Sequence, residues 1–126
     1  MASEALTFWN LAQALIERFP EIKAPVEEAL ADARREGGRL YPHVLLEEYF
    51  LPLLVGSIAE PSRLAKRGVQ FLEELLTSGD EDVVGTALLN VVEPIAADKQ
   101  RLAAAWPHMG EAARKWTTEL RGRNRA

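Results

Sequence analysis

The segment 71–98 holds two apolar helical stripes joined by a short turn, and this pattern most constrains the fold. Apolar residues recur every three or four positions up to Leu76, the chain turns at Ser78-Gly79, and Asp80 can cap a second apolar helix that reaches Ile95. Two amphipathic helices joined so closely pack as antiparallel neighbours, because each must bury its apolar face. The segment therefore predicts a protein built from helical hairpins.

The rest of the chain continues this pattern, with prolines and glycines as boundary signals. We expect Pro52 to kink or split a helix that is apolar around most of its circumference, and Pro94 to bend the helix that begins at Asp80, because proline lacks the N–H that a helix interior needs. The last helix is expected over 109–120. The other predicted helix boundaries, in chain order, are Ser3, Pro20, Pro25, Gly37-Gly38, Pro42, Pro61, Asp80 and Pro107.

The predicted fold class is all-α, because Ala, Leu and Glu are abundant and no segment shows the sustained alternation of a strand. At 126 residues, we expect one compact domain of about five to seven helices over residues 1–120, followed by a basic frayed tail over 121–126. The segment from Asp80 to Leu89 resembles the second helix of HEAT-type repeats. A HEAT-like stack of antiparallel hairpins and an irregular bundle both fit the sequence.

Charge is distributed unevenly along the chain. Residues 1–98 hold eight Lys and Arg against seventeen Asp and Glu, whereas residues 99–126 hold seven against two. The acidic body argues against a large nucleic-acid footprint and suits a basic protein partner. The chain has no cysteine, and its apolar stretches are too broken to span a bilayer. We expect a cytoplasmic protein that binds neither nucleic acid nor membrane.

Acidic pairs on different predicted helices are the candidate partner-binding residues. Their carboxylates would form a ridge that docks a basic partner, speeding association and excluding wrong partners. We expect Trp9 and Trp116 in the core, and Trp106 partly exposed at a helix break, where it would serve as an apolar anchor. The candidate set is Glu47, Glu48, Glu73, Glu74, Asp80, Asp82 and Trp106.

Catalytic motifs are absent from the sequence, so we expect no enzyme activity and no cofactor. No Gly-x-Ser-x-Gly segment, phosphate-binding glycine loop or His-Glu-x-x-His motif is present. His43 and Glu47 stand four residues apart on one helix face and could supply two metal ligands, but the sequence identifies no third. A metal-dependent enzyme using this pair is the least favoured alternative.

Four motifs between residues 40 and 121 carry a family resemblance. They are Leu40-Tyr41-Pro42-His43, Phe71-Leu72-Glu73-Glu74-Leu75, Gly79-Asp80-Glu81-Asp82-Val83 and Pro107-His108-Met109-Gly110-Glu111. With these motifs the segment resembles a family of small bacterial helical proteins of unknown or immunity-like function. Some members look like antidotes that bind and block a cognate toxin, so the resemblance implies a small acidic cytoplasmic binding protein. It carries over no functional residue.

The leading functional hypothesis is a non-enzymatic immunity protein. It would occlude the active cleft of a bacterial toxin whose substrate-binding surface is basic. The alternative is a helical scaffold or adaptor that self-associates. The sequence leaves open the identity of the partner, the toxin's chemistry, the helix face that binds and the oligomeric state.

Overall fold

The computed structural model describes residues 6–59 and 63–124, and the predicted boundaries Ser3 and Pro61 lie outside these ranges. The described residues form helices and turns without a strand, which confirms the all-α prediction. The helices pack into one compact domain around a single apolar core. In chain order they are α1 (Leu11–Arg18), η1 (Pro20–Ile22), α2 (Lys23–Arg35), α3 (Pro42–Val44), η2 (Leu45–Phe50), α4 (Leu51–Ala59), α5 (Arg63–Leu76), α6 (Glu81–Ala87), η3 (Leu88–Val92), α7 (Glu93–Ala96), α8 (Lys99–Ala105), η4 (Trp106–His108) and α9 (Glu111–Asn124).

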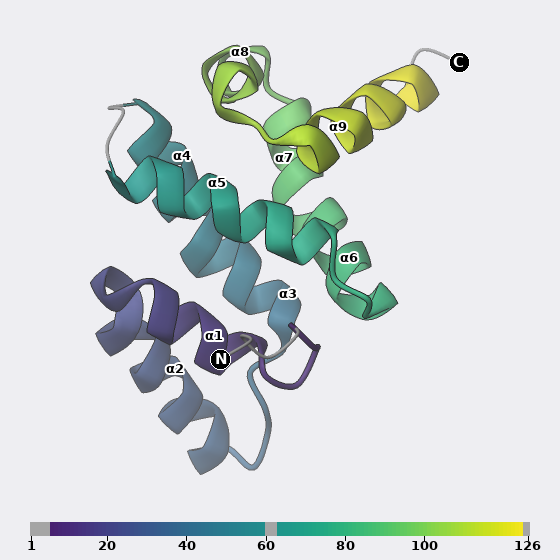
Figure 1. Ribbon diagram of the computed structural model, residues 1–126. Coiled ribbons are helices and arrows are strands. Elements are labelled where there is room, and N and C mark those ends of the chain that lie inside the picture. Colours follow the sequence, from purple (N-terminus) through teal and green to yellow (C-terminus); the bar gives the residue numbers. More distant parts are fainter. Residues whose placement is uncertain (1–5, 60–62, 125–126) are drawn as a thin grey trace, which may run out of the picture.

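Two long helices lie at the centre of the fold and run side by side in the same direction (Figure 1). The first joins α3, η2 and α4, and the second joins α6, η3 and α7, each without a break. Their directions agree because α3 packs on α6 and η2 packs on η3. Helix α5 runs back between them and packs on α4 and α6, while α9 packs on α5 and α7. The result is a stack of helices in two layers.

Each central helix carries a π turn just before its internal proline. The wider turn accommodates Pro52 and Pro94, whose missing N–H and bulky ring a regular α-helix cannot accept. The prediction that Pro52 could split its helix is therefore wrong, because the helical hydrogen bonding changes register and continues. In both turns the N–H of the residue before the proline bonds to the carbonyl five residues back: Leu51 to Leu46, and Glu93 to Leu88.

The two central helices share one local feature at a separation of 42 residues. A shift of that length superposes Pro52 on Pro94 and places the two π turns in register. A period of about 40–47 residues is that of HEAT and armadillo repeats, in which equivalent helices stack in parallel. The parallel central pair is a feature that such repeats also have, in a chain whose described helices form one all-α domain.

The core joins the N-terminal helices to the central pair through three phenylalanines. Phe19, Phe50 and Phe71 come from the end of α1, from η2 and from α5, and all three are fully buried. Their ring centroids lie 5.3–5.7 Å apart. Tilted and edge-to-face arrangements at this spacing are favourable for aromatic rings. The cluster therefore holds three otherwise separate elements together.

Trp9 contradicts the expectation that it belongs to the core, since 73% of it is exposed. The first regular helix begins at Leu11, so Trp9 lies in the preceding turn and outside the apolar stripe. Thr7 and Asn10 close that turn, each side chain accepting a hydrogen bond from the other's backbone N–H. Trp116 is half-buried against the core. Trp106 is 38% exposed, which confirms the prediction that it is partly exposed.

The predicted end of α2 is confirmed, whereas α9 extends beyond its predicted end. Gly37 and Gly38 end α2 as expected, with Gly37 at a φ of 77°, a conformation that glycine adopts without strain. Helix α9 instead continues to Asn124, past Leu120, where the apolar pattern stops. A helix that is already nucleated propagates by backbone hydrogen bonds and needs no apolar partner in each turn.

Candidate binding surface

Asp80, one of the predicted partner-binding residues, ties two parts of the chain together. Its Oδ1 accepts a hydrogen bond from the N–H of Asp82 at 2.9 Å, which caps α6. Its Oδ2 accepts one from the N–H of Phe8 at 2.9 Å. The hydrogen bond from Phe8, followed by those at the helix N-terminus, lowers the pKa of the Asp80 carboxyl. Asp80 therefore fastens the N-terminal segment to the α5–α6 turn.

Glu73 caps a helix that is distant in sequence. Its two carboxylate oxygens accept hydrogen bonds from the N–H groups of Ala112 at 2.8 Å and Ala113 at 2.9 Å, in the first turn of α9. A carboxylate at this place satisfies orphan N–H groups and complements the helix dipole. Gly110 lies directly against it, and a Cβ at that position would come within 2.3 Å of Glu73 Cδ.

Glu74 joins α5 to α1. Its carboxylate forms a bidentate ion pair with Arg18, in which Nη2 donates to Oε1 at 2.9 Å and Nη1 donates to Oε2. This hydrogen bonding raises the pKa of Arg18. Arg67 forms a second ion pair with Glu21 and donates to the carbonyl of Arg18 at 3.0 Å. Three of the six predicted acidic residues are thus engaged in contacts within the chain.

The other three predicted acidic residues, Glu47, Glu48 and Asp82, are exposed on the central helices. Glu47 and Glu48 lie in η2, and Asp82 lies in the first turn of α6. The structure brings these helices side by side, because α3 packs on α6 and η2 on η3. These three residues therefore lie on neighbouring helices and remain available to a partner.

Leu89, a position not predicted from the sequence, is a large apolar residue exposed on the second central helix. It is 63% exposed in η3. The 42-residue shift aligns it with Glu47, and both positions are exposed. The available signal was its place outside the apolar stripe of Val84, Leu88, Val91 and Ile95. We use the name acidic face for the exposed residues Glu47, Glu48, Glu81, Asp82, Leu89 and Glu93.

The charge of the acidic face has one sign. Neither the segment 42–59 nor the segment 81–98, which between them contain both central helices, includes a single Lys or Arg. Its carboxylates therefore face solvent without an intrahelical cationic partner, and their fields add. His43 lies at the start of the first helix. Its ring stacks on that of Tyr41, with the two ring centroids 5.9 Å apart.

The described structure adds no third ligand to the predicted metal pair, and it places Trp106 beside basic residues. Within the described residues, no group of three or more His, Asp and Glu side chains is placed to hold a metal ion. The guanidinium of Arg114 lies 5.4 Å over the Trp106 ring and donates to its carbonyl at 3.1 Å. Trp106 borders a hollow of about 430 Å³ whose charged lining residues are Lys99 and Arg121. The structure thus places Trp106 among basic residues.

Comparisons with known proteins give a family. No helix in the described part of the chain has both the length and the apolar character needed to cross a bilayer. No curated protein and no solved structure matches the chain. One family model matches residues 12–123, which cover all the described helices except the first residue of α1 and the last of α9. The chain therefore belongs to the family described as DUF7674, a domain of unknown function.

Proposed function

We propose that this protein is a non-enzymatic binding module that docks a basic protein partner through its acidic face. The observation that carries the proposal is the exposed Leu89 on the second of two parallel helices. Both helices carry carboxylates and neither carries Lys or Arg. Interfaces commonly place an apolar contact inside a polar rim. The acidic face has this composition.

The two kinds of residue would contribute differently to binding. Burying Leu89 against a partner contributes about 1.5 kcal/mol or more, because its apolar surface leaves water. The surrounding carboxylates contribute mainly to the association rate, since they attract a basic surface over about 10 Å at moderate salt. Glu73, Glu74 and Asp80 act within the fold, so we assign binding to Glu47, Glu48 and Asp82 among the predicted residues.

The most concrete form of the proposal is an immunity protein in the cytoplasm that covers the basic cleft of a bacterial toxin. Support comes from the acidic face and from the resemblance of residues 40–121 to small helical bacterial proteins with immunity-like function. A toxin that binds an anionic substrate has a basic cleft, and a surface of one charge sign is complementary to it. A helical scaffold that self-associates is disfavoured by this surface, because two acidic faces repel each other.

The experiment measures association with a toxin domain encoded beside this protein. The variant Glu47→Lys/Glu48→Lys reverses two charges on the acidic face, and Glu27→Lys/Glu28→Lys reverses an identical exposed pair on α2. We expect the first variant to lower the association rate constant roughly tenfold or more at low salt and the second to change it little. Stopped-flow fluorescence at several salt concentrations gives these rates.

Two results would overturn the proposal. One is an equal loss of association rate in the two charge-reversal variants, because net charge alone would then explain the change. The other is unchanged binding after Leu89→Asp in the Glu47→Lys/Glu48→Lys background, because that variant removes the apolar centre as well. Light scattering of the isolated protein tests the scaffold alternative. A self-associating scaffold would form a stable oligomer without any partner.

A further inference from the structure

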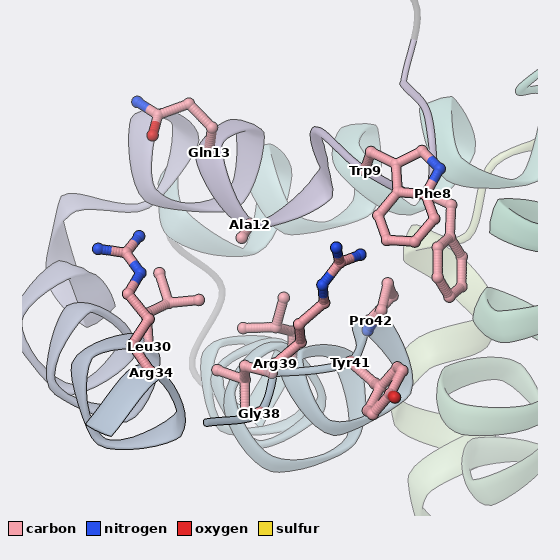
Figure 2. Close-up of a pocket in the computed structure, with 12 residues that line it drawn as sticks. Phe8, Trp9, Ala12, Gln13, Leu30, Arg34, Gly38, Arg39, Tyr41 and Pro42 are labelled. Atoms are coloured by element: carbon pink, nitrogen blue, oxygen red, sulfur yellow. The ribbon is translucent and has the colours of Figure 1, made fainter. Parts of the chain in front are cut away.

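A pocket lined by arginine and aromatic residues opens between the N-terminal helices and the start of α3 (Figure 2). Its volume is about 350 Å³, within the range of small-molecule sites. None of the acidic-face residues lines it. The lining residues are Phe8, Trp9, Ala12, Gln13, Leu30, Arg34, Gly38, Arg39, Leu40, Tyr41, Pro42 and Leu45.

The end of α2 shapes one wall of this pocket. The N–H of Gly38 bonds to the carbonyl of Ala33 at 2.8 Å, and the N–H of Gly37 bonds to that of Arg34 at 3.0 Å. This pair of bonds is a Schellman motif, and the positive φ of Gly37 lets the chain reverse there. As a result Arg34, in the last turn of α2, and Arg39, just after it, border the same pocket.

The two arginines are the pocket's charged residues, and no carboxylate of the described residues pairs with them. Arg18, Arg35 and Arg67 each pair with a carboxylate. By contrast, the side chains of Arg34 and Arg39 form no ion pair with any residue in the described ranges. Figure 2 shows both guanidinium groups extending toward α1. In a chain with four more acidic than basic residues, two such arginines at one pocket mark a place for an anion.

Stacking holds Arg39 in a suitable orientation. Its guanidinium carbon lies 5.1 Å from the centroid of the Trp9 ring. A guanidinium that stacks on an aromatic face still has its N–H donors in its own plane, where a carboxylate or phosphate can accept them in pairs. Trp9 and Tyr41 are 73% and 53% exposed, although both are large aromatic residues. Their exposure leaves apolar area at the pocket mouth that a ligand can cover.

Part of the pocket lining is apolar. Ala12, Leu30 and Leu40 are partly buried there, and Leu45 is fully buried. A ligand that fits this site must combine a charged group for the arginines with an apolar body for the leucines. Inorganic anions lack the body, and neutral apolar molecules lack the charge.

We propose that this pocket binds a small organic anion, with its carboxylate or phosphate held by Arg39 or Arg34 and its apolar body over Leu30, Leu40 and Leu45. Trp9 and Tyr41 cover the body from the side. The site is separate from the acidic face, so the proposal stands or falls independently of the partner-binding function.

The test titrates the full chain with defined probes and follows the indole N–H signal of Trp9 by NMR. The spectrum of Trp9→Phe assigns this signal among those of the three tryptophans. Hexanoate and hexyl phosphate present the two charged groups on one apolar body. We expect saturable shifts with at least one of them, and at least tenfold weaker binding of hexanol and of inorganic phosphate.

The variant Arg34→Gln/Arg39→Gln should weaken binding of the better probe about tenfold or more. Arg34→Lys/Arg39→Lys, which retains the charge, should weaken it less. The matched control is Arg63→Gln/Lys66→Gln, which removes two exposed cations from α5 and should leave binding unchanged. Binding of hexanol as tight as that of hexanoate, equal losses in the two glutamine variants, or no shift with either charged probe would overturn the proposal. Well-dispersed spectra establish that each variant is folded.

Discussion

At the scale of single residues, the carboxylates show how one residue type serves two purposes. Glu73 and Asp80 each accept two backbone hydrogen bonds, and at least one of those donors is distant in sequence. Glu47 and Glu48 belong to the same class of acidic pair in the sequence and remain exposed. The difference lies in the partner that the fold brings within 3 Å, because a carboxylate takes the strongest donors available to it.

The contact between Glu73 and Gly110 gives a prediction at this scale. Gly110→Ala should destabilise the protein by about 1–3 kcal/mol, because its Cβ would overlap the Glu73 carboxylate and displace the cap of α9. Glu73→Ala alone should cost about 1–2 kcal/mol through the lost cap. Urea unfolding measures both free energies.

The double variant Glu73→Ala/Gly110→Ala tests whether the two effects are one. We expect it to be about as stable as Glu73→Ala, because the group that clashes with the new methyl is gone. Glu119→Ala, an exposed substitution on α9, is the control and should change stability by less than about 0.5 kcal/mol. Additive losses in the double variant would contradict the proposed contact.

At the scale of elements, helix packing depends on small residues where two helices approach closely. Gly68 of α5 is buried against α4, and a Cβ there would lie 2.8 Å from Leu54 Cδ1. Gly85 of α6 occupies a helical position with nothing within 4 Å of such a Cβ. The same residue type therefore has a packing role in one helix and none in the other.

The prediction at this scale compares one substitution at the two glycines. Gly68→Val should destabilise the protein by about 1–3 kcal/mol, since the side chain would push α5 away from α4. Gly85→Val should be neutral or slightly stabilising, because valine is a better helix former than glycine and meets open space. Thermal unfolding followed by circular dichroism distinguishes them. Similar effects at both sites would contradict the packing role assigned to Gly68.

At the scale of the whole molecule, apolar packing and charge are arranged differently. One aromatic cluster joins the N-terminal helices to the stack, with Phe71 in contact with both Phe19 and Phe50. Charge is instead separated between the acidic face on the central helices and the Arg34–Arg39 pocket at the N-terminal end. The apolar core thus joins the N-terminal helices to the central helices, whereas the two charged regions lie apart on the surface.

The prediction at this scale is that Phe71→Ala weakens the whole fold. We expect a loss of about 3–5 kcal/mol, because the cavity lies where three elements meet. Unfolding should remain a single transition by circular dichroism and by tryptophan fluorescence, since Trp9 and Trp116 lie at different ends of the stack. Early loss of the Trp9 signal alone would indicate that the N-terminal helices form an independent unit.

The helices could be predicted from the sequence because their signals are local. The apolar spacing, the Gly37-Gly38 ending and the Asp80 cap depend on residues within a few positions, and all three are found in the structure. The π turns before Pro52 and Pro94 were not predicted, since both a break and a wider turn relieve the same proline. The exposure of Trp9 was not predicted because the first helix was expected to begin before it. The helix begins at Leu11, so Trp9 lies outside the apolar face of that helix.

The sequence by itself determined the all-α class, the helix boundaries near its glycines and caps, and the acidic character of the body. Only the tertiary structure decided which carboxylates are engaged and which are exposed, and that Arg34, Arg39, Trp9 and Tyr41 line one pocket. Local hydrogen bonding and hydrophobic periodicity act over a few residues and can be recognised along the chain. Contacts such as Glu73 with α9 or Phe8 with Asp80 join residues far apart in sequence, and packing alone selects them.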